Sequence, residues 1–208
     1  LGDEKIDEQG ATYTGGVIGY KNTTQVIDGS FNVSCTVSGY DNVGGIVGFN
    51  AGGDINKVSF NGRITGDGEN VGGIVGCNTG GNISNCTNNV IIDSESAKNV
   101  GGIVGLNANN KIEYCYNKSN IKGAKNVGGI AGVTSGTNID HCGNDGEITG
   151  NSNTMWGESL EEVKASDLYL FYNITGANST GTGGIVGKIY HTTVTCSYNK
   201  GKVTCNYN

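Results

Sequence analysis

The chain lacks proline, and its 208 residues include only one methionine, one tryptophan and two histidines. Without proline it is neither collagen-like nor a proline-rich linker, so its 38 glycines, more than twice the roughly 7% of average usage, must serve another backbone purpose. No apolar stretch approaches the ~20 residues that span a bilayer. The first residues, LGDEKIDEQG, lack the basic and apolar segments of a signal peptide. We therefore expect a mature part of a longer surface protein, with no membrane insertion in this segment.

Positive charge is also scarce, because 13 Lys and Arg stand against 19 Asp and Glu and leave a net charge of -6. No basic cluster is present that could neutralise a run of phosphates, which excludes nucleic acid as a partner. The 7 cysteines are odd in number and form no C-x-x-C pair, which argues against a zinc site or a fully paired disulfide framework. H-E-x-x-H, G-x-S-x-G and P-loop motifs do not occur. We predict no cofactor and no metal.

What the sequence does contain is an internal repeat. Its core is a six-residue glycine motif, in which a Val or Thr is followed by two glycines, two apolar residues and a third glycine. Copies of the motif begin at Thr14, Val43, Val71, Val100, Val127 and Thr182. The spacing between copies is nearly constant, except that the last interval is almost twice as long as the others. A period of roughly 28 residues is typical of a solenoid.

Two apolar columns follow each motif at fixed distances. Ten positions after the second glycine stand Val26, Ile55, Ile83, Ile112, Ile139 and Val194, and nine positions later stand Cys35, Ile64, Ile92, Ile121, Ile148 and Val203. One such unit cannot bury its apolar side alone, whereas stacked units form continuous ladders. The spacing predicts an all-β fold, a parallel β-helix (β-solenoid) of about six to seven coils of ~28 residues, forming a single domain over residues 1–208.

Asparagine and cysteine keep the same register. Three asparagine columns comprise Asn88, Asn117, Asn144 and Asn199, preceded by Phe31 and Phe60; Asn42, Asn70, Asn99 and Asn126; and Asn50, Asn78 and Asn107. Asparagine tolerates left-handed backbone angles and bonds to an identical side chain on the next rung, so these columns predict the corners of the coils. Cys86, Cys115 and Cys142 share a column with Val58 and Ser197, which predicts small buried fillers. Whether these cysteines are free thiols stays open.

The glycine motif raises a problem of side-chain direction. Strict alternation would place Val43, Gly45 and Val47 on one face of a strand and Ile46 on the other. Ile46 and its equivalents would then form a long exposed apolar ridge. Either a bulge turns these residues inward or another element covers them, and we favour the bulge because adjacent glycines permit it.

One interval breaks the repeat, because residues 149–182 contain no glycine motif. We interpret this segment as a degenerate coil or insertion with a short helix, opened by a capping box at Ser159 and extending to about Asp167. It also holds the aromatic group Trp156, Tyr169, Phe171 and Tyr172. These aromatic side chains either pack the helix onto the solenoid or form a recognition patch for sugar or protein, and they are our candidate binding residues.

One pair of carboxylates is a possible catalytic site. Glu113 and Asp140 share a register in successive coils, so stacking would place their backbones about 5 Å apart, near the separation of the two carboxyl groups in retaining glycosidases. No groove of Arg, Lys or aromatic residues surrounds them, so we expect a solvated rung and predict no catalytic residue. His141 and His191 have no partners in the sequence and are expected at the surface.

The pattern V-G-G-I-V-G-x-N followed by I-x-x-C-x-N-x-G-x-I-T-G resembles the GLUG-motif repeat, although Ile replaces the Leu of the family name. The resemblance extends from about Thr14 to Val203. It implies an extracellular location on the bacterial cell surface, since such repeats occur in bacterial surface proteins, including metallopeptidases that cleave immunoglobulin A. The resemblance assigns no active-site residue to this chain.

These observations predict a non-enzymatic, adhesin-like module of a bacterial cell-surface protein, which binds a host protein, matrix or glycan ligand or serves as an extended stalk. Two alternatives remain. One is a carbohydrate-active β-helix enzyme that uses Glu113 and Asp140, and the other is the non-catalytic stalk of a secreted peptidase.

Overall fold

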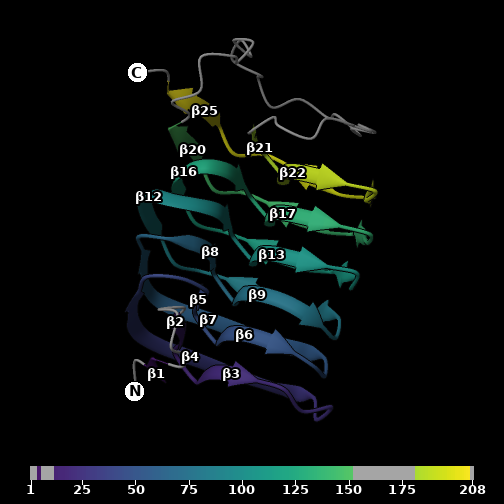
Figure 1. The fold of residues 1–208 in the computed structure, drawn as a ribbon. Coiled ribbons are helices and arrows are strands. Elements are labelled where there is room, and N and C mark those ends of the chain that lie inside the picture. The colour runs from purple at the N-terminus through teal and green to yellow at the C-terminus, as the bar shows by residue number, and fades with distance from the viewer. Residues whose placement is uncertain (1–3, 6–11, 152–180, 207–208) are drawn as a thin grey trace.

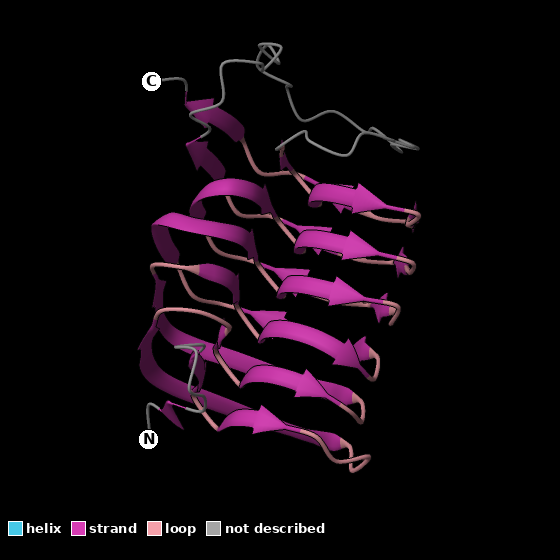
Figure 2. Cartoon of the chain, viewed as in Figure 1, coloured by secondary structure: helices cyan, strands magenta, loops and turns pink. Residues whose placement is uncertain are grey.

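The computed structural model describes residues 4–5, 12–151 and 181–206, and in these residues every regular element is a β-strand. The strands wind as a stack of turns from the N-terminal to the C-terminal end of the molecule (Figure 1), and the strands of neighbouring turns lie parallel. The colouring in Figure 2 shows strands joined by short loops throughout the stack. The predicted all-β parallel solenoid is confirmed.

One sheet contains six strands, one from each successive turn. These are β3 (Ile18–Lys21), β6 (Val47–Ala51), β9 (Val75–Gly80), β13 (Val104–Ala108), β17 (Ala131–Ser135) and β22 (Val186–Tyr190). Between the first and the last of them the chain completes about five turns. The predicted count of six to seven coils is not confirmed, and the predicted short helix lies outside the described residues.

A second sheet of 19 strands supplies the other sides of each turn. Its first side comprises β2 (Thr12–Gly15), β5 (Val43–Gly44), β8 (Glu69–Gly72), the ends of β12 (Ile92–Gly101) and β16 (Ile121–Gly128), and β21 (Thr182–Gly183). Short strands form the next side: β10 (Ile83–Ser84), β11 (Thr87–Asn88), β14 (Ile112–Glu113), β15 (Tyr116–Asn117), β18 (Asn138–Asp140), β19 (Gly143–Asn144), β23 (Thr193–Thr195) and β24 (Tyr198–Asn199). The return side contains β20 (Ile148–Asn151) and β25 (Val203–Asn206), while β4 (Ile27–Gly39) and β7 (Ile55–Gly66) run through both sides. β1 (Glu4–Lys5) pairs antiparallel with β2.

The glycine motif is a corner between the two sheets. β8 ends at Gly72, the chain bends at Gly73 and Ile74, and β9 begins at Val75. The N–H groups of Ile74 and Val75 both donate to the carbonyl of Ile103 on the next turn, at 3.0 Å each. Because the bend breaks the alternation, Ile74 and Val75 are both fully buried. The prediction that this isoleucine column turns inward is confirmed, but the single strand predicted over the motif is in fact two strands in different sheets.

The second glycine of the motif leaves room for the asparagine column opposite it. A Cβ on Gly73 would lie 2.5 Å from Asn88 Cγ, and a Cβ on Gly102 would lie 2.6 Å from Asn117 Cγ. Real Cβ atoms essentially never approach another heavy atom within 3.0 Å. These Cβ atoms would lie closer still to the carbonyl of the equivalent glycine on the next turn, and a Cβ on the first glycine, Gly72, would overlap the carbonyl oxygen of Val75. The Gly-Gly signature therefore reflects close packing of the corner against neighbouring backbone and, at the second glycine, against a buried side chain as well.

The three asparagine columns form hydrogen-bonded ladders, as predicted. The left-handed corner predicted for all three is confirmed only in the column of Asn42, because the columns of Asn50 and Asn88 lie within strands. In the column of Asn88, Asn117 and Asn144, each Nδ2 donates to Oδ1 of the next asparagine, at 2.8, 2.6 and 2.6 Å. In the corner column before the glycine motif the asparagines have positive φ, 50° at Asn42 and 64° at Asn70. Most of these amides are thus bonded between neighbouring rungs, which offsets much of the cost of burying them. The buried Oδ1 atoms of Asn50 and Asn126 are exceptions, because neither has a hydrogen-bond partner among the described residues.

Three register predictions in the first turn are wrong. Ile27, and not Val26, pairs with Ile55, and Val37, and not Cys35, pairs with Ile64. The first turn holds one extra residue before Ile27 and a second at the irregularity between Asp28 and Phe31, so counting from the glycine motif fails there. Phe31 likewise pairs with Val58 and not with Phe60.

Candidate functional site

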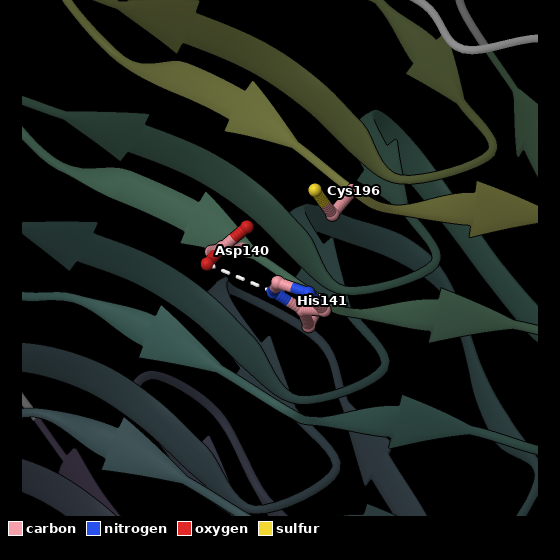
Figure 3. A group of neighbouring side chains, drawn as sticks. All are labelled: Asp140, His141 and Cys196. Atoms are coloured by element: carbon pink, nitrogen blue, oxygen red, sulfur yellow. Dashed lines mark ion pairs between the residues drawn. The ribbon is translucent and has the colours of Figure 1, made fainter.

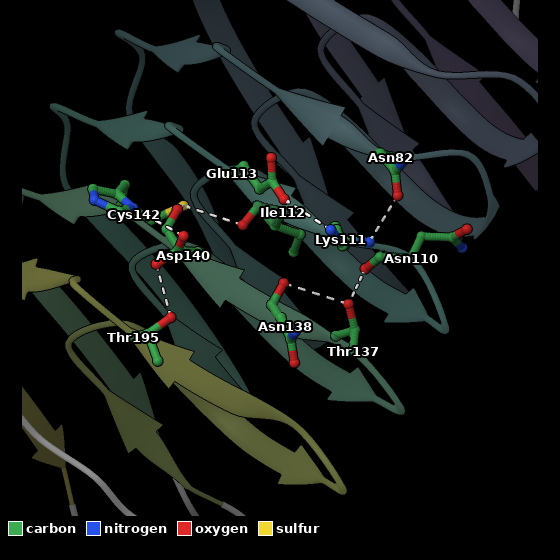
Figure 4. Close-up of polar contacts among 11 residues, drawn as sticks. Asn82, Asn110, Lys111, Ile112, Glu113, Thr137, Asn138, Asp140, Cys142 and Thr195 are labelled. Atoms are coloured by element: carbon green, nitrogen blue, oxygen red, sulfur yellow. Dashed lines mark hydrogen bonds and ion pairs between the residues drawn. The ribbon is translucent and has the colours of Figure 1, made fainter.

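The predicted binding residues Trp156, Tyr169, Phe171 and Tyr172 lie outside the described residues, together with the predicted helix from Ser159 to Asp167. Their role stays a prediction. Among the described residues, polar and titratable side chains gather on the outer side of β10, β14, β18 and β23, as the close-up in Figure 4 shows around Ile112. We treat this outer side as the candidate functional site.

The strands of this side alternate between core and solvent. Ile112 and Ile139 are fully buried, and the residues after them, Glu113 and Asp140, are partly exposed and pair in register. The predicted stacking of these two carboxylates on adjacent rungs is confirmed. In the same outward column stand Asp28, Asn56, Ser84 and Thr195.

Each of the two carboxylates has its own partners. Glu113 Oε1 lies 3.5 Å from Lys111 Nζ on its own turn. Asp140 accepts a 2.7 Å hydrogen bond from Thr195 Oγ1 on the following turn, and its Oδ2 lies 2.9 Å from His141 Nδ1 (Figures 3 and 4). The hydrogen bond from Thr195, followed by that from His141, lowers the pKa of Asp140 below its ordinary value.

This arrangement does not suit a glycosidase acid. A retaining glycosidase needs one carboxyl group with a raised pKa, so that it can protonate the leaving oxygen. The pKa of Asp140 is instead lowered, and Glu113 is held by a lysine ammonium group. A lowered pKa disfavours the protonated form of Asp140 that such an acid requires.

The residue that follows the outward column adopts a left-handed backbone in five successive turns. The φ values are 54° at Lys57 and Asn85, 52° at Tyr114, 49° at His141 and 46° at Cys196. A positive φ is uncommon for residues other than glycine, and here it turns the chain so that the next residue points back into the core. In three turns that next residue is a fully buried cysteine. The side chains of the left-handed residues therefore lie on the outer surface of the solenoid.

This corner column brings together groups that are far apart in the sequence. The rings of Tyr114 and His141 stack with centroids 4.9 Å apart and planes at 25°. On the next rung stands Cys196, which is exposed. One potential ligand atom each from Asp140, His141 and Cys196 lies within 4.8 Å of the others. Figure 3 shows these three side chains.

Sequence reasoning missed this cluster. His141 and Cys196 are distant in the sequence, on either side of the interval that breaks the repeat, and they form no recognised ligand motif. Yet each lies two positions after its column aliphatic, Ile139 or Val194, so the repeat register contained the signal. His141 is 46% exposed, which confirms its predicted surface position.

The cysteine column is buried as predicted. Cys86, Cys115 and Cys142 have no exposed surface, and none of the seven cysteines forms a disulfide. Cys77 lies in another column, in register with Phe49, Leu106 and Val133 on neighbouring turns. Burial raises the pKa of Cys115, and it raises the pKa of Cys77 to about 12. These two thiols are therefore neutral and act as fillers of the core.

Acidic side chains elsewhere on the surface pair with cations one turn away. Arg63 lies 2.9 Å from Asp93, Lys98 lies 3.1 Å from Glu69, and Lys122 lies 3.4 Å from Glu95. These side chains are largely exposed, so each pair contributes at most a few tenths of a kcal/mol. These pairs connect neighbouring rungs electrostatically, but they do not form a binding or catalytic site.

Parallel strands stacked in register on a repeat of nearly constant length place the protein among the β-solenoid repeat proteins. The model of the family described as the GLUG motif matches residues 39–65, 67–93 and 96–122. Residues 39–122 are therefore three tandem GLUG repeats, each one turn long, as the resemblance predicted. Comparison with curated proteins and with solved structures gave no match. In the described residues no helix is long and apolar enough to cross a membrane.

Proposed function

We propose that the chain is a non-enzymatic repeat module of a bacterial cell-surface protein, extracellular and adhesin-like, which presents its outer columns to a host protein or glycan. The GLUG repeats over residues 39–122 and the solenoid fold support this proposal. We expect this module to be part of a larger surface protein. A stack of turns provides an extended binding surface and needs no catalytic centre.

The observation that carries the proposal is the contrast between inward and outward positions. The inward positions hold the same residue types on successive rungs, with Ile83, Ile112 and Ile139 in one ladder. The outward column beside them varies between neutral and acidic side chains. A scaffold that fixes its core and varies its exposed column is suited to recognition, in which a partner contacts several rungs at once.

The alternative with a specific observation in its favour is a carbohydrate-active enzyme, since Glu113 and Asp140 stand on adjacent rungs. The lowered pKa of Asp140 weighs against it. A stalk without ligands, including the stalk of a secreted peptidase, is the remaining alternative, and it predicts no binding at all.

One experiment separates these three functions. The purified chain is applied to a glycan array and to immobilised host matrix proteins, and the same preparation is incubated with polysaccharides. We expect saturable binding and no release of sugars. Polysaccharide turnover that is lost in Glu113→Gln but kept in the control Glu69→Gln would refute the proposal in favour of the enzyme. Absence of binding to every probe would refute it in favour of the stalk.

The predicted aromatic patch is tested in the same assay. Trp156→Ala should weaken binding if the patch takes part in recognition. Unchanged binding would remove Trp156 from the site and leave the outer columns as the binding surface.

A further inference from the structure

We propose that Asp140, His141 and Cys196 form a binding site for a borderline divalent transition-metal ion such as Zn²⁺, which ties the last described turn to the turn before it. Carboxylate, imidazole and thiolate groups are the three kinds of side chain that bind zinc in proteins. A mixed set of this kind favours zinc or cobalt over calcium or magnesium, which prefer oxygen ligands alone.

The distances fit such an ion with small movements. Tetrahedral zinc with bonds of about 2.0–2.2 Å to nitrogen and oxygen holds two such ligands roughly 3.4 Å apart. His141 Nδ1 and Asp140 Oδ2 are now 2.9 Å apart in a hydrogen bond, so they would separate by about 0.5 Å as the ion replaces the proton between them. A zinc–sulfur bond of about 2.3 Å would hold the thiolate roughly 3.5 Å from the other two ligands. The cluster lies within 4.8 Å, so a rotation of the exposed Cys196 side chain closes the remaining gap.

The surrounding residues fix the orientation of two of the ligands. Thr195 donates to Asp140 Oδ1 at 2.7 Å, which leaves Oδ2 directed at His141. Tyr114 stacks on the imidazole ring from the preceding rung. Partners of this kind hold metal ligands in place and raise metal affinity in known sites. Thr195 and Tyr114 are thus positioning residues and not ligands.

The backbone explains why the ligands converge. His141 and Cys196 both occupy the left-handed corner position of their turns, so their side chains leave the solenoid on the same side, one rung apart. Asp140 comes from the outward column immediately before that corner. Three protein ligands leave at least one coordination position open to water or to a ligand from outside.

The position of the cluster gives the ion a structural consequence. The turn that carries His141 and the turn that carries Cys196 are adjacent in space, although the longest interval of the repeat separates them along the chain. An ion bound by both turns would link them directly. Because it binds the folded arrangement and not the separated turns, it would raise the stability of the final turn by mass action.

Cobalt provides the test, because a Co²⁺–thiolate bond gives a charge-transfer band in the near ultraviolet. The untagged, reduced chain is titrated with Co²⁺ and then with Zn²⁺, which should displace the cobalt and raise the melting temperature. We expect one saturable equivalent with the thiolate band. Cys196→Ser should abolish the band, and His141→Ala and Asp140→Asn should each weaken binding at least about tenfold.

Matched controls come from the same chain. Cys205→Ser and His191→Ala remove an exposed thiol and the other histidine, and both should leave the titration unchanged. Far-ultraviolet circular dichroism of every variant checks that the solenoid is intact. Three results would overturn the proposal: no saturable binding in the unaltered chain, a band that persists in Cys196→Ser, or an affinity unaffected by His141→Ala, which would indicate a lone thiol binding metal nonspecifically.

Discussion

The packing of the glycine corner can be tested by adding one methyl group at Gly102. A Cβ at this position would lie 2.6 Å from Asn117 Cγ and closer still to the carbonyl of Gly129 on the next turn. One of these neighbours is backbone, and the other belongs to a hydrogen-bonded ladder in which Asn88, Asn117 and Asn144 are fully buried. Neither can move without disturbing an adjacent rung.

The expected cost of Gly102→Ala follows from these contacts. Overpacking a close-packed interior costs about 1–3 kcal/mol. Opening the corner also lengthens the backbone hydrogen bonds from Gly102 to Gly128 and from Ile103 to Ile130, now 3.2 and 2.9 Å, and each contributes about 0.5–1.5 kcal/mol. We therefore expect a loss of about 2–6 kcal/mol in the free energy of unfolding.

Gly52→Ala is the matched control, because a Cβ at Gly52 would meet its nearest neighbour, the carbonyl of Thr23, at 3.2 Å in a partly exposed turn. We expect it to cost less than about 1 kcal/mol. Urea unfolding followed by circular dichroism measures both variants, and hydrogen exchange shows whether protection is lost first in the turns around Gly102, since solenoids can unfold in parts. Equal stability of the two variants would refute the steric account of the Gly-Gly signature.

Three further predictions concern the asparagine ladder, a surface ion pair and a buried thiol. Asn117→Ala should destabilise the protein by about 2–4 kcal/mol in urea unfolding, because it removes the acceptor of one Asn88 Nδ2 hydrogen and the donor to Asn144 Oδ1, and both groups are buried. A loss below about 1 kcal/mol would contradict the buried ladder. Arg63→Ala should change the free energy of unfolding by less than about 0.5 kcal/mol, with little dependence on salt, because its ion pair with Asp93 is exposed. A larger loss in urea unfolding would show that this surface pair stabilises the fold more than expected. The folded-state pKa of Cys77, raised to about 12 from 9.0, means that unfolding releases its proton above pH 9, so stability should fall between pH 9 and 12. Cys77→Val, which introduces the type of residue that Val133 supplies in the same column, should lessen that fall, and an unchanged pH profile would count against the shift.

Much of the fold could be predicted from the sequence. The regular spacing of the glycine motifs and of the apolar columns required stacked parallel turns, because only stacking hides so many aliphatics in a chain without long apolar runs. The asparagine columns predicted the hydrogen-bonded ladders because they recur at the same repeat spacing and stacking brings identical amides together. The prediction failed at Ile27 and Val37, where two extra residues shift the register. A fixed count carries no information about local bulges, whereas backbone pairing does.

The candidate site was only partly predictable. The register gave Glu113 and Asp140 on adjacent rungs, but their partners depend on side-chain directions that spacing does not supply. The cluster with Cys196 required a left-handed backbone at His141, a conformation that is uncommon outside glycine.

The sequence by itself therefore determined the repeat, the parallel stacking and the identity of the buried ladders, because these follow from periodic burial. Only the tertiary structure decided that the glycine motif is a corner, where the carbonyl of the next turn and an asparagine ladder from another side of the coil leave no room for a Cβ at the second glycine. It alone also decided which polar groups meet on the outer side, because the turns of His141 and Cys196 are far apart along the chain and become neighbours only when the solenoid stacks one on the other.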